Sequence, residues 1–556
     1  MRGVVSVFYR KERTSTQGRL RRGDGLRGGG RPIHLSGGAT EVEDGTVGSD
    51  QRAGAYHQAT KNSWESVRGG GRALDWENRP RPFKAYRGVE KIDLPRDLPG
   101  LEVRAMDALA GSAGRGEKVP AGPPTAKDLS RLLQLGAGAH RWLRFPDGEV
   151  VHFRTYASAG ALYPNEAYLV CGDLLELPEG VYHYDPLAHA LDRLRPGDHR
   201  GHLVRACARE PAVAGAPATL VVTGIPWRTG WKYGDRGYRH LFWDAGMIVA
   251  NVLAVAAAEG LGARVVLGFA DGEIEALLGL DPRREFPLCL VPVGEGHPVQ
   301  AGPQPPEAVA FEEEPASARE DRFPAIREVN DAGRLADHRA VQRWRAAELR
   351  AAGQAWPQPV VVEPAPPPPD PLDRVILRRG SARGFGPGSM PAEVLSAILA
   401  AATGGVPTDL VPRGERLTRI FLVANAVPGL PTGALAYQDH RFHLLRAGEF
   451  RRKAAFLCLD QRLAADAAAA CFLLSDLDRL LRTVGDRGYR VAQLEAGIVA
   501  GRLYLGAYAF GYGATGLTFY DDEVTQFFAP EAATMECVLV VCAGESMGRS
   551  DLRPIR

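Results

Sequence analysis

The chain has 556 residues, more than one ordinary domain, which predicts at least two. Its 45% hydrophobic and 24% charged residues are typical of a globular protein, and a net charge of +2 is too small to indicate a nucleic-acid or membrane-surface partner. The seven cysteines are odd in number and form no CxxC pair. This argues against a disulfide framework or a zinc site and is expected of a protein in a reducing cytoplasm.

The N-terminal segment is basic and rich in glycine. Residues 1–31 carry nine Lys or Arg against two Asp or Glu, and no apolar stretch follows that would make them a secretory signal. We therefore expect residues 1–54 to form a disordered basic segment. A mis-called start codon and a nucleic-acid-binding arm are the alternatives.

A run of small residues, SAGALYPNE, occupies Ser158–Glu166. Small residues and their backbone N–H groups let a planar ligand approach closely, and the Tyr-Pro turn leads into an apolar strand. An ordinary loop with a Tyr-Pro turn would have the same features.

The chain contains an internal duplication. The string GDRGYR begins at Gly234 and again at Gly485, 251 residues later. In the segments that follow, Asp244 matches Glu495 at the same offset. A repeat of this length indicates two copies of one domain.

Each copy predicts the same succession of elements. A long helix that is apolar on every face must be buried on every face, which is expected at an interface between two similar domains. The first of these helices is not expected to span a membrane, because Asp244, Asn251 and Glu259 would be penalised in a bilayer. The predicted elements are the helices 241–260 and 491–511, the strands 264–269 and 515–520, and the final strands 287–293 and 537–543.

The segment 301–370 is rich in proline and charged residues. It predicts a linker with a helical middle near 333–352 and a stiff polyproline tail, a tether that can span the two domains without strand pairing of its own. The expected domains are therefore 55–300, which includes an N-terminal extension, and 371–556.

Arg379, Ser381 and Arg383 alternate on a short turn before a predicted helix. Two guanidiniums and a hydroxyl at this spacing suit a phosphate group. Because Arg-rich surface turns are common, a solvated turn is the alternative.

Several of these motifs, in order, resemble those of SagB-type dehydrogenases and cyanobactin-oxidase-like proteins, which are nitroreductase-fold flavin enzymes of azole-forming peptide pathways. SAGALYPNE resembles their SAGALYPxE signature, RRGSARGF their FMN-phosphate turn, and WKYGDRGYRHLFWDAG their KYxxRxYR…DxG segment. The resemblance covers roughly residues 55–300 and 370–545. It implies an α+β fold in which two tandem nitroreductase-like domains form an intramolecular pseudo-dimer with FMN as cofactor. One departure is Met247, where the family often has His.

The resemblance also implies roles for individual residues. In this family the Lys-Tyr pair is held to be catalytic, and it matches Lys232 and Tyr233. Oxidising an azoline ring requires a base for a ring-carbon proton, a task for a desolvated Lys or the adjacent Tyr, whereas a pair that merely begins a helix is the alternative. No metal is implied. The implied cofactor-binding residues are Arg379, Ser381 and Arg383 at the phosphate, Ser158, Ala159, Gly160, Leu162, Tyr163, Pro164, Asn165 and Glu166 over the ring, and Gly516 and Leu517 beside it.

The two copies have lost different parts of this site. The second has Thr483-Val484 in place of Lys-Tyr and no SAGALYP string, and the first has no recognisable phosphate turn before its first helix. In nitroreductase-fold dimers each FMN lies at the interface and contacts both protomers. We therefore expect one complete hybrid site, with the phosphate turn from the second domain and the loop and Lys-Tyr pair from the first.

The implied function is FMN-dependent dehydrogenation of thiazolines or oxazolines to azoles in a peptide natural-product pathway. Its substrate would be a peptide or small molecule, and its partners cyclodehydratase proteins. An NAD(P)H-dependent reductase of nitro groups, quinones or enones and a flavin-free scaffold that docks a peptide are the alternatives. Arg228 and Trp231, in the irregular stretch 186–232, are candidate pocket residues, with surface or core roles equally open.

Overall fold

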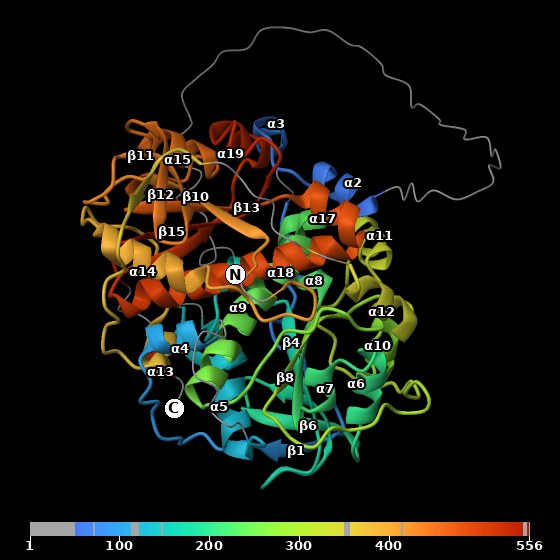
Figure 1. Cartoon of the computed structure of the whole chain (residues 1–556). Coiled ribbons are helices and arrows are strands. Elements are labelled where there is room, and N and C mark those ends of the chain that lie inside the picture. The colour runs from blue at the N-terminus through green and yellow to red at the C-terminus, as the bar shows by residue number, and fades with distance from the viewer. Residues whose placement is uncertain are drawn as a thin grey trace, which may run out of the picture.

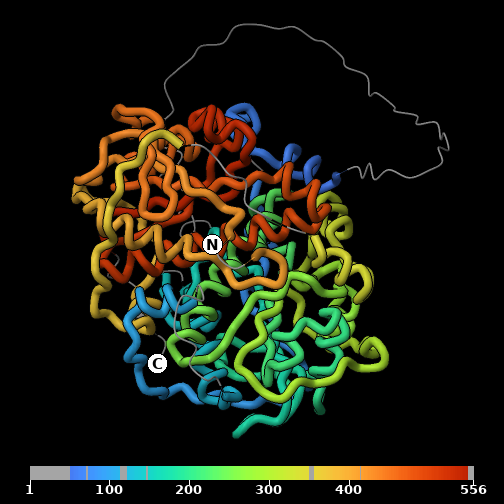
Figure 2. Tube along the Cα trace, viewed as in Figure 1, coloured from blue at the N-terminus to red at the C-terminus, as the bar shows by residue number. Residues whose placement is uncertain are grey.

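The computed structural model describes residues 51–69, 73–112, 122–145, 148–347, 349, 356–412, 415–548 and 553–554. Two α+β halves of one design lie against each other, with the first half (51–300) in blue to green and the second half (371–554) in orange to red (Figure 1). The same division is clear along the Cα trace (Figure 2). The fold is thus the expected intramolecular pseudo-dimer.

Each half is built on an antiparallel sheet, and the two sheets share one strand order except that the second has an additional edge strand, β14. The first sheet runs β1-β6-β5-β4-β7-β8, and the second runs β9-β12-β11-β10-β13-β15-β14 when traced from the equivalent edge. In the first sheet the strands are β1 (Glu90–Asp93), β4 (Asn165–Cys171), β5 (Gly180–Asp185), β6 (Ala190–Pro196), β7 (Ala218–Gly224) and β8 (Phe286–Val293). In the second they are β9 (Pro359–Val361), β10 (Thr418–Ala424), β11 (Gly433–Gln438), β12 (Arg441–Ala447), β13 (Ala469–Ser475), β14 (Gly513–Leu517) and β15 (Glu536–Gly544).

A third, smaller sheet lies at the junction of the halves, where β2 (Ala139–Arg144) pairs with β3 (Val150–Arg154) and with β16 (Arg553–Pro554) near the C-terminus. The helices of the first half are α2 (Arg52–Ala59), α3 (Trp64–Arg68), α4 (Ala105–Ser112), α5 (Ala126–Ala137), α6 (Arg200–Ala206), α7 (Pro211–Ala214), α8 (Pro226–Tyr233), α9 (Gly237–Ala258) and α10 (Asp271–Leu278). Those after it are α11 (Pro324–Ala332), α12 (His338–Arg345), α13 (Leu372–Arg378), α14 (Ala392–Ala402), α15 (Arg451–Leu457), α16 (Arg462–Asp466), α17 (Leu477–Val484), α18 (Arg487–Ala509) and α19 (Asp521–Phe527).

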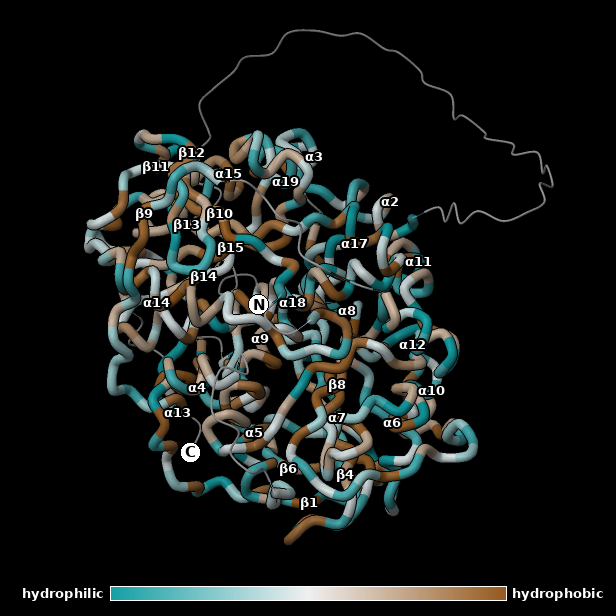
Figure 3. The backbone as a smooth tube through the Cα atoms, in the orientation of Figure 1, coloured by the Kyte–Doolittle hydropathy of each residue, from teal (hydrophilic) through white to brown (hydrophobic). Residues whose placement is uncertain are grey.

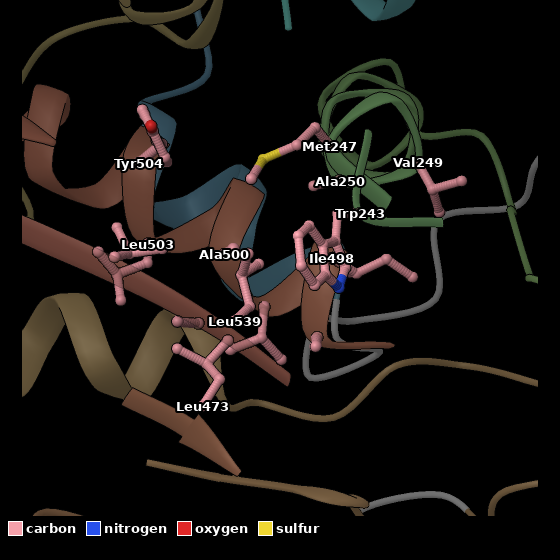
Figure 4. Packing of buried hydrophobic residues seen from close by; sticks show 14 of the residues in the cluster. Trp243, Met247, Val249, Ala250, Leu473, Ile498, Ala500, Leu503, Tyr504 and Leu539 are labelled. Carbon is pink, nitrogen blue, oxygen red and sulfur yellow. The ribbon is translucent and has the colours of Figure 1, made fainter. Parts of the chain in front are cut away.

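The two long apolar helices, α9 and α18, cross at the centre of the molecule (Figure 1). Their side chains interlock, with Met247 reaching from α9 towards α18 and Trp243 lying beside Ile498 (Figure 4). By length and composition α9 could cross a membrane, but here it is buried between the two halves. One hydrophobic core therefore runs through both halves, and apolar segments gather in the interior (Figure 3).

Reciprocal buried ion pairs explain why GDRGYR occurs twice. Arg239 of the first copy contacts Asp521 of the second half at 2.7 Å, and Arg490 of the second copy contacts Asp271 of the first half at 2.8 Å. All four side chains are almost fully buried. Each copy of the motif therefore secures the opposite half.

The segment between the halves is packed onto the protein rather than free of it. Two helices, α11 and α12, stand in place of the single predicted helix at 333–352, and their apolar faces are buried. The segment also contributes a strand of its own, because β9 pairs with β12. Ahead of both halves, residues 1–50 lie outside the described range, and α2 contacts α11 and α17.

The prediction of matching strands after the two interface helices holds only in the second half, where β14 forms. In the first half the segment 264–269 makes isolated bridges instead, among them a parallel one between Val265 and Thr408. The loop that contains Thr408 therefore lies alongside this segment of the first half.

Candidate functional site

One cavity at the junction of the halves gathers most of the predicted site residues. Its volume is about 740 Å³, within the range of small-molecule sites. We call it the interface cavity. Of the predicted residues, its lining includes Ser158, Ala159, Gly160, Tyr163, Lys232 and Tyr233 from the first half and Arg379, Ser381, Arg383, Gly516 and Leu517 from the second.

Four residues predicted to bind the cofactor do not line this cavity. Leu162 packs in a small cluster with Trp227 and Trp231, and Pro164 is buried beside it. Asn165 donates from Nδ2 to the carbonyls of Thr223 and Leu241. These side chains fix the base of the loop, because the turn at Tyr163 directs the following residues into the sheet.

Glu166 is the fourth of these residues, and it lies in a buried ion pair with Arg228 at 2.5 Å. Burial alone would raise the pKa of Glu166, but Arg228 and His183 bring it well below its ordinary value. Arg228 is thereby placed in the core rather than in the cavity. Trp231 is also buried in the core, and its Nε1 donates to the Asp75 carbonyl.

The small-residue loop is fixed by Asp244, which lies on α9 and lines the cavity. Ser158 Oγ donates to Asp244 Oδ2 at 2.5 Å, and Ala159 N donates to Oδ1 at 3.1 Å. Burial raises the pKa of Asp244 to about 7, although the bonds from Ser158 and Ala159 oppose the rise. The matching residue in the second copy, Glu495, caps the backbone N–H groups of Leu417 and Thr418 in a similar way.

Lys232 and Tyr233 end helix α8 beside this loop. A β-carbon on Gly160, where φ is 64°, would lie 3.1 Å from Tyr233 Oη and 3.2 Å from Lys232 Nζ, so any larger residue would press against both groups. Burial, and then the charge of Arg383, lower the pKa of Lys232 to about 8. A lysine with this pKa is partly neutral near pH 8 and can accept a proton.

Tyr233 is held by a stack of rings that the sequence did not reveal. His240 lies parallel to it, with ring centroids 4.0 Å apart, and Trp243 follows at 4.5 Å from His240. Trp243 in turn donates from Nε1 to Gln493 Oε1 of α18. His240 Nδ1 donates to the Arg236 carbonyl, and burial together with nearby cations holds the pKa of His240 far below its ordinary value, so its ring is neutral.

The Arg-Ser-Arg turn enters the cavity from the second half. Arg379 is buried, and its Nε and Nη2 donate to the carbonyls of Thr155 and Arg154 in the first half. Ser381 Oγ lies 3.4 Å from Tyr504 Oη, which also accepts from the N–H of Gly516 at 2.5 Å. The turn is thus part of the contact between the halves as well as part of the cavity wall.

The cavity suits a flat anionic ligand. Its lining includes Gly516, which is exposed within strand β14, and the side chains of Met247, Tyr504 and Leu539. These three side chains are drawn in Figure 4. Among the lining residues in the described part of the chain, Asp244 is the only carboxylate. The basic lining residues are His140, Arg141, Arg154, Lys232, His240, Arg378, Arg379 and Arg383. Sequence reasoning missed His140 and Arg141 because their hairpin carries no recognised motif.

The chain itself covers the pseudo-equivalent position on the other side of the interface. At the offset of 251 residues, Gly516 corresponds to Val265, whose N–H donates to the Pro407 carbonyl at 2.8 Å. Tyr233 corresponds to Val484, whose carbonyl accepts from Trp344 Nε1 at 3.0 Å. Helix α12 and the 407–409 loop therefore occupy this position. The predicted lack of a phosphate turn in the first copy concerns residues 101–133, which form α4 and the start of α5 on either side of residues 113–121, and only 113–121 lie outside the described range.

Comparisons with known proteins agree with this architecture. The nitroreductase family matches residues 120–295 and 376–544, one segment in each half. A protein of Methanocaldococcus jannaschii named as a nitroreductase is 34% identical over 172 residues, which is 31% of this chain and 81% of that protein. The microcin B17-processing protein McbC of Escherichia coli is 32% identical over 144 residues, 25% of this chain and 52% of McbC, so the chain spans about half of McbC.

The fold extends along nearly the whole length of a solved structure. A protein from Anabaena variabilis named as a nitroreductase superimposes with a TM-score of 0.69 at 24% identity, covering 89% of this chain and 99% of that one. The tandem arrangement of the two halves is therefore shared. With the family matched in both halves, the chain belongs to the nitroreductase family of oxidoreductases.

Proposed function

We propose that the protein is an FMN-dependent dehydrogenase of the SagB type that oxidises azoline rings in a peptide natural product to azoles. The observation that carries this proposal is the approach of Lys232 and Tyr233 to Gly160 inside the interface cavity. A base with a lowered pKa beside a small-residue loop is what removal of a ring-carbon proton requires.

The residues of the cavity fit FMN. Arg379, Ser381 and Arg383 offer donors for a phosphate, and Gly516 and Gly160 leave flat surfaces without β-carbons. Among the described lining residues, the strong excess of cations over the one carboxylate, Asp244, favours a ligand with negative charge. When bound, FMN would supply the hydride acceptor of the oxidation.

The protein's own residues would handle the proton. Lys232 takes it from the ring carbon as a neutral amine, a form that burial and Arg383 make available near pH 8. Tyr233, stacked on His240, keeps its hydroxyl beside Gly160 and next to the amine. Asp244 keeps the loop closed on this side through its bonds to Ser158 and Ala159.

The peptide substrate is supported by the similarity to McbC, a microcin B17-processing protein. An azoline must first be made by cyclodehydration, so cyclodehydratase proteins are the partners that we propose. We also propose a reducing cytoplasmic location, since all seven cysteines are free and buried.

The test is to incubate the FMN-loaded protein with a thiazoline-containing peptide and follow its mass. Loss of two hydrogen atoms per ring in the wild type, and none in a Lys232→Ala variant that retains flavin, is the expected result. NAD(P)H-driven reduction of a nitroarene or quinone without peptide oxidation would replace this proposal with the reductase. If the protein binds no flavin even after reconstitution, the flavin-free scaffold that docks a peptide would be the remaining function.

A further inference from the structure

We propose that Arg141 of the first half and Arg379 of the second form one anion-binding site across the two halves, which takes a phosphate monoester or a carboxylate. Arg141 belongs to none of the motifs that define the family resemblance. The inference rests on the proposed function only for the source of the anion, which is either the FMN phosphate or an acidic group of the substrate.

A bulge in the small sheet turns Arg141 into the interface cavity. In the pairing of β2 with β3, Ala139 faces Arg154 and Arg141 faces Phe153, so His140 is an extra residue. Consecutive residues of a regular strand point to opposite faces, whereas a bulge re-aims side chains. Both His140 and Arg141 accordingly line the cavity.

His140 secures the bulge without adding charge. Its Nδ1 donates to the Phe153 carbonyl at 3.1 Å. Burial, and then the charges of Arg141 and Arg379, lower the pKa of His140 to about 3, so the ring is neutral at any physiological pH. Arg141 is thereby presented by a rigid, uncharged neighbour.

Arg379 is fixed beside the same end of the hairpin. Its Nε and Nη2 each donate, at 3.2 Å, to the carbonyls of Thr155 and Arg154, the two residues that follow Phe153. No hydrogen bond of its Nη1 is found among the described residues, and this side chain is only 6% exposed. A buried guanidinium oriented by two carbonyls and left with a donor to spare is prepared for an anion.

Among the residues that the structure describes, neither cation has a counter-ion of its own. In the described part of the chain Arg141 makes no ion pair or hydrogen bond through its guanidinium, and Asp244 is hydrogen-bonded to the Ser158 loop. Burial, and then the charge of Arg379, lower the pKa of Arg141. An anion between the two guanidiniums would relieve this repulsion and supply the missing acceptors.

The first experiment titrates the apo-protein with FMN and with riboflavin, which lacks the phosphate, by quenching of flavin fluorescence. Wild type is compared with Arg141→Gln and with Arg144→Gln, which changes an exposed arginine on the same strand. If the anion is the FMN phosphate, Arg141→Gln should raise the Kd of FMN about 10- to 100-fold, as expected for a lost charge-assisted bond, and leave that of riboflavin unchanged. Arg144→Gln should change neither.

A second experiment tests the case in which the anion is an acidic group of the substrate. If Arg141→Gln leaves FMN affinity unchanged, calorimetry of inorganic phosphate binding to the FMN-loaded protein should show binding in the wild type that Arg141→Gln abolishes. A protein that binds no flavin at all would refute the proposed function, and the same phosphate titration of the apo-protein would still decide this site. The proposal would be overturned if Arg141→Gln leaves the affinity for FMN unchanged and the wild type and the variant bind phosphate equally or do not bind it at all. Circular dichroism of each variant checks that it is folded.

Discussion

Gly246 of α9 lies directly against Gly497 of α18, so that a β-carbon on Gly246 would sit 2.5 Å from the carbonyl carbon of Gly497. The two glycines occupy equivalent positions, 251 residues apart. The backbones touch where the two copies cross, and this close approach brings the Lys-Tyr pair of one half into the same cavity as the Arg-Ser-Arg turn of the other.

The close crossing of the two helices predicts that one methyl group added at Gly246 strongly lowers the stability of the protein. Gly246→Ala must separate two backbones rather than displace a flexible side chain, so we expect it to lower the free energy of unfolding by about 3 kcal/mol, the upper end of typical overpacking costs. Denaturant unfolding measures this. Gly272→Ala on α10, where the nearest atom is 3.7 Å away, is the control and should stabilise by up to about 1 kcal/mol. Equal stability of the two variants would contradict the close crossing.

The reciprocal ion pairs should govern stability in acid. Burial would raise the pKa of Asp521, but Arg236 and Arg239 bring it below its ordinary value. A carboxylate with a lowered folded pKa stabilises above its unfolded pKa of about 3.9, and this contribution is lost as the pH falls towards the folded pKa.

Asp521→Asn would leave two buried guanidiniums without their partner and should cost about 3–5 kcal/mol at pH 7, a penalty that shrinks in acid. The mirror variant Asp271→Asn should behave alike, because Asp271 pairs with Arg487 and Arg490. Thermal unfolding between about pH 2 and about pH 7 measures both, because carboxylates with an ordinary or lowered pKa titrate in the acidic part of that range. Asp478→Asn, in an exposed pair, should change stability by less than about 0.5 kcal/mol. A pH-independent loss would argue against the charge as its cause.

Lys232 should set the pH dependence of turnover. Because its pKa is about 8 and the neutral amine is the base, the rate should rise with pH and level off above that value. Lys232→Ala should retain flavin and lose about 10²- to 10⁴-fold in kcat, and Lys232→Arg should be equally inactive because it stays protonated. Lys127→Ala, at an exposed position on α5, is the control. Full activity of Lys232→Ala would refute the assigned role.

Arg383 should act on both the flavin and this base. Arg383→Ala removes a predicted phosphate contact, so we expect weaker FMN binding. It also removes the cation that helps to lower the pKa of Lys232, so at saturating FMN the pH profile should move to higher pH. FMN titration and rate profiles measure the two effects separately. A profile that does not move would show that burial alone sets the pKa of Lys232.

Gly160 should be required for activity more than for folding. An alanine there would meet Tyr233 Oη and Lys232 Nζ, and displacement of reacting groups by about 1 Å can cost about 100-fold in rate. Gly88→Ala has similar backbone strain, with φ at 68°, but no atom within 4 Å of the added carbon. Both variants should lose about 1 kcal/mol of stability, and only Gly160→Ala should lose turnover. Kinetics and thermal unfolding of the pair decide whether the methyl contact or the strain matters.

Part of this protein was readable from its sequence, because the relevant signals are local. The repeated GDRGYR string, the apolar runs around Gly246 and Gly497 and the turn at Arg379 predicted two copies of one domain that share an interface. Helical apolar periodicity and the residue types of turns depend on neighbours in the chain, so they can be recognised without knowledge of the fold.

Only the tertiary structure decided which atoms meet. The guanidinium of Arg379 donates to a carbonyl of the first half, and Asn165 and Glu166 point into the sheet rather than into the cavity. The segment 264–269 pairs with the loop at Thr408 instead of forming a regular strand. A bulge at His140 also aims Arg141 into the cavity. Each of these depends on the register of a sheet or on contacts between distant segments, and the pattern of a single segment does not contain that information.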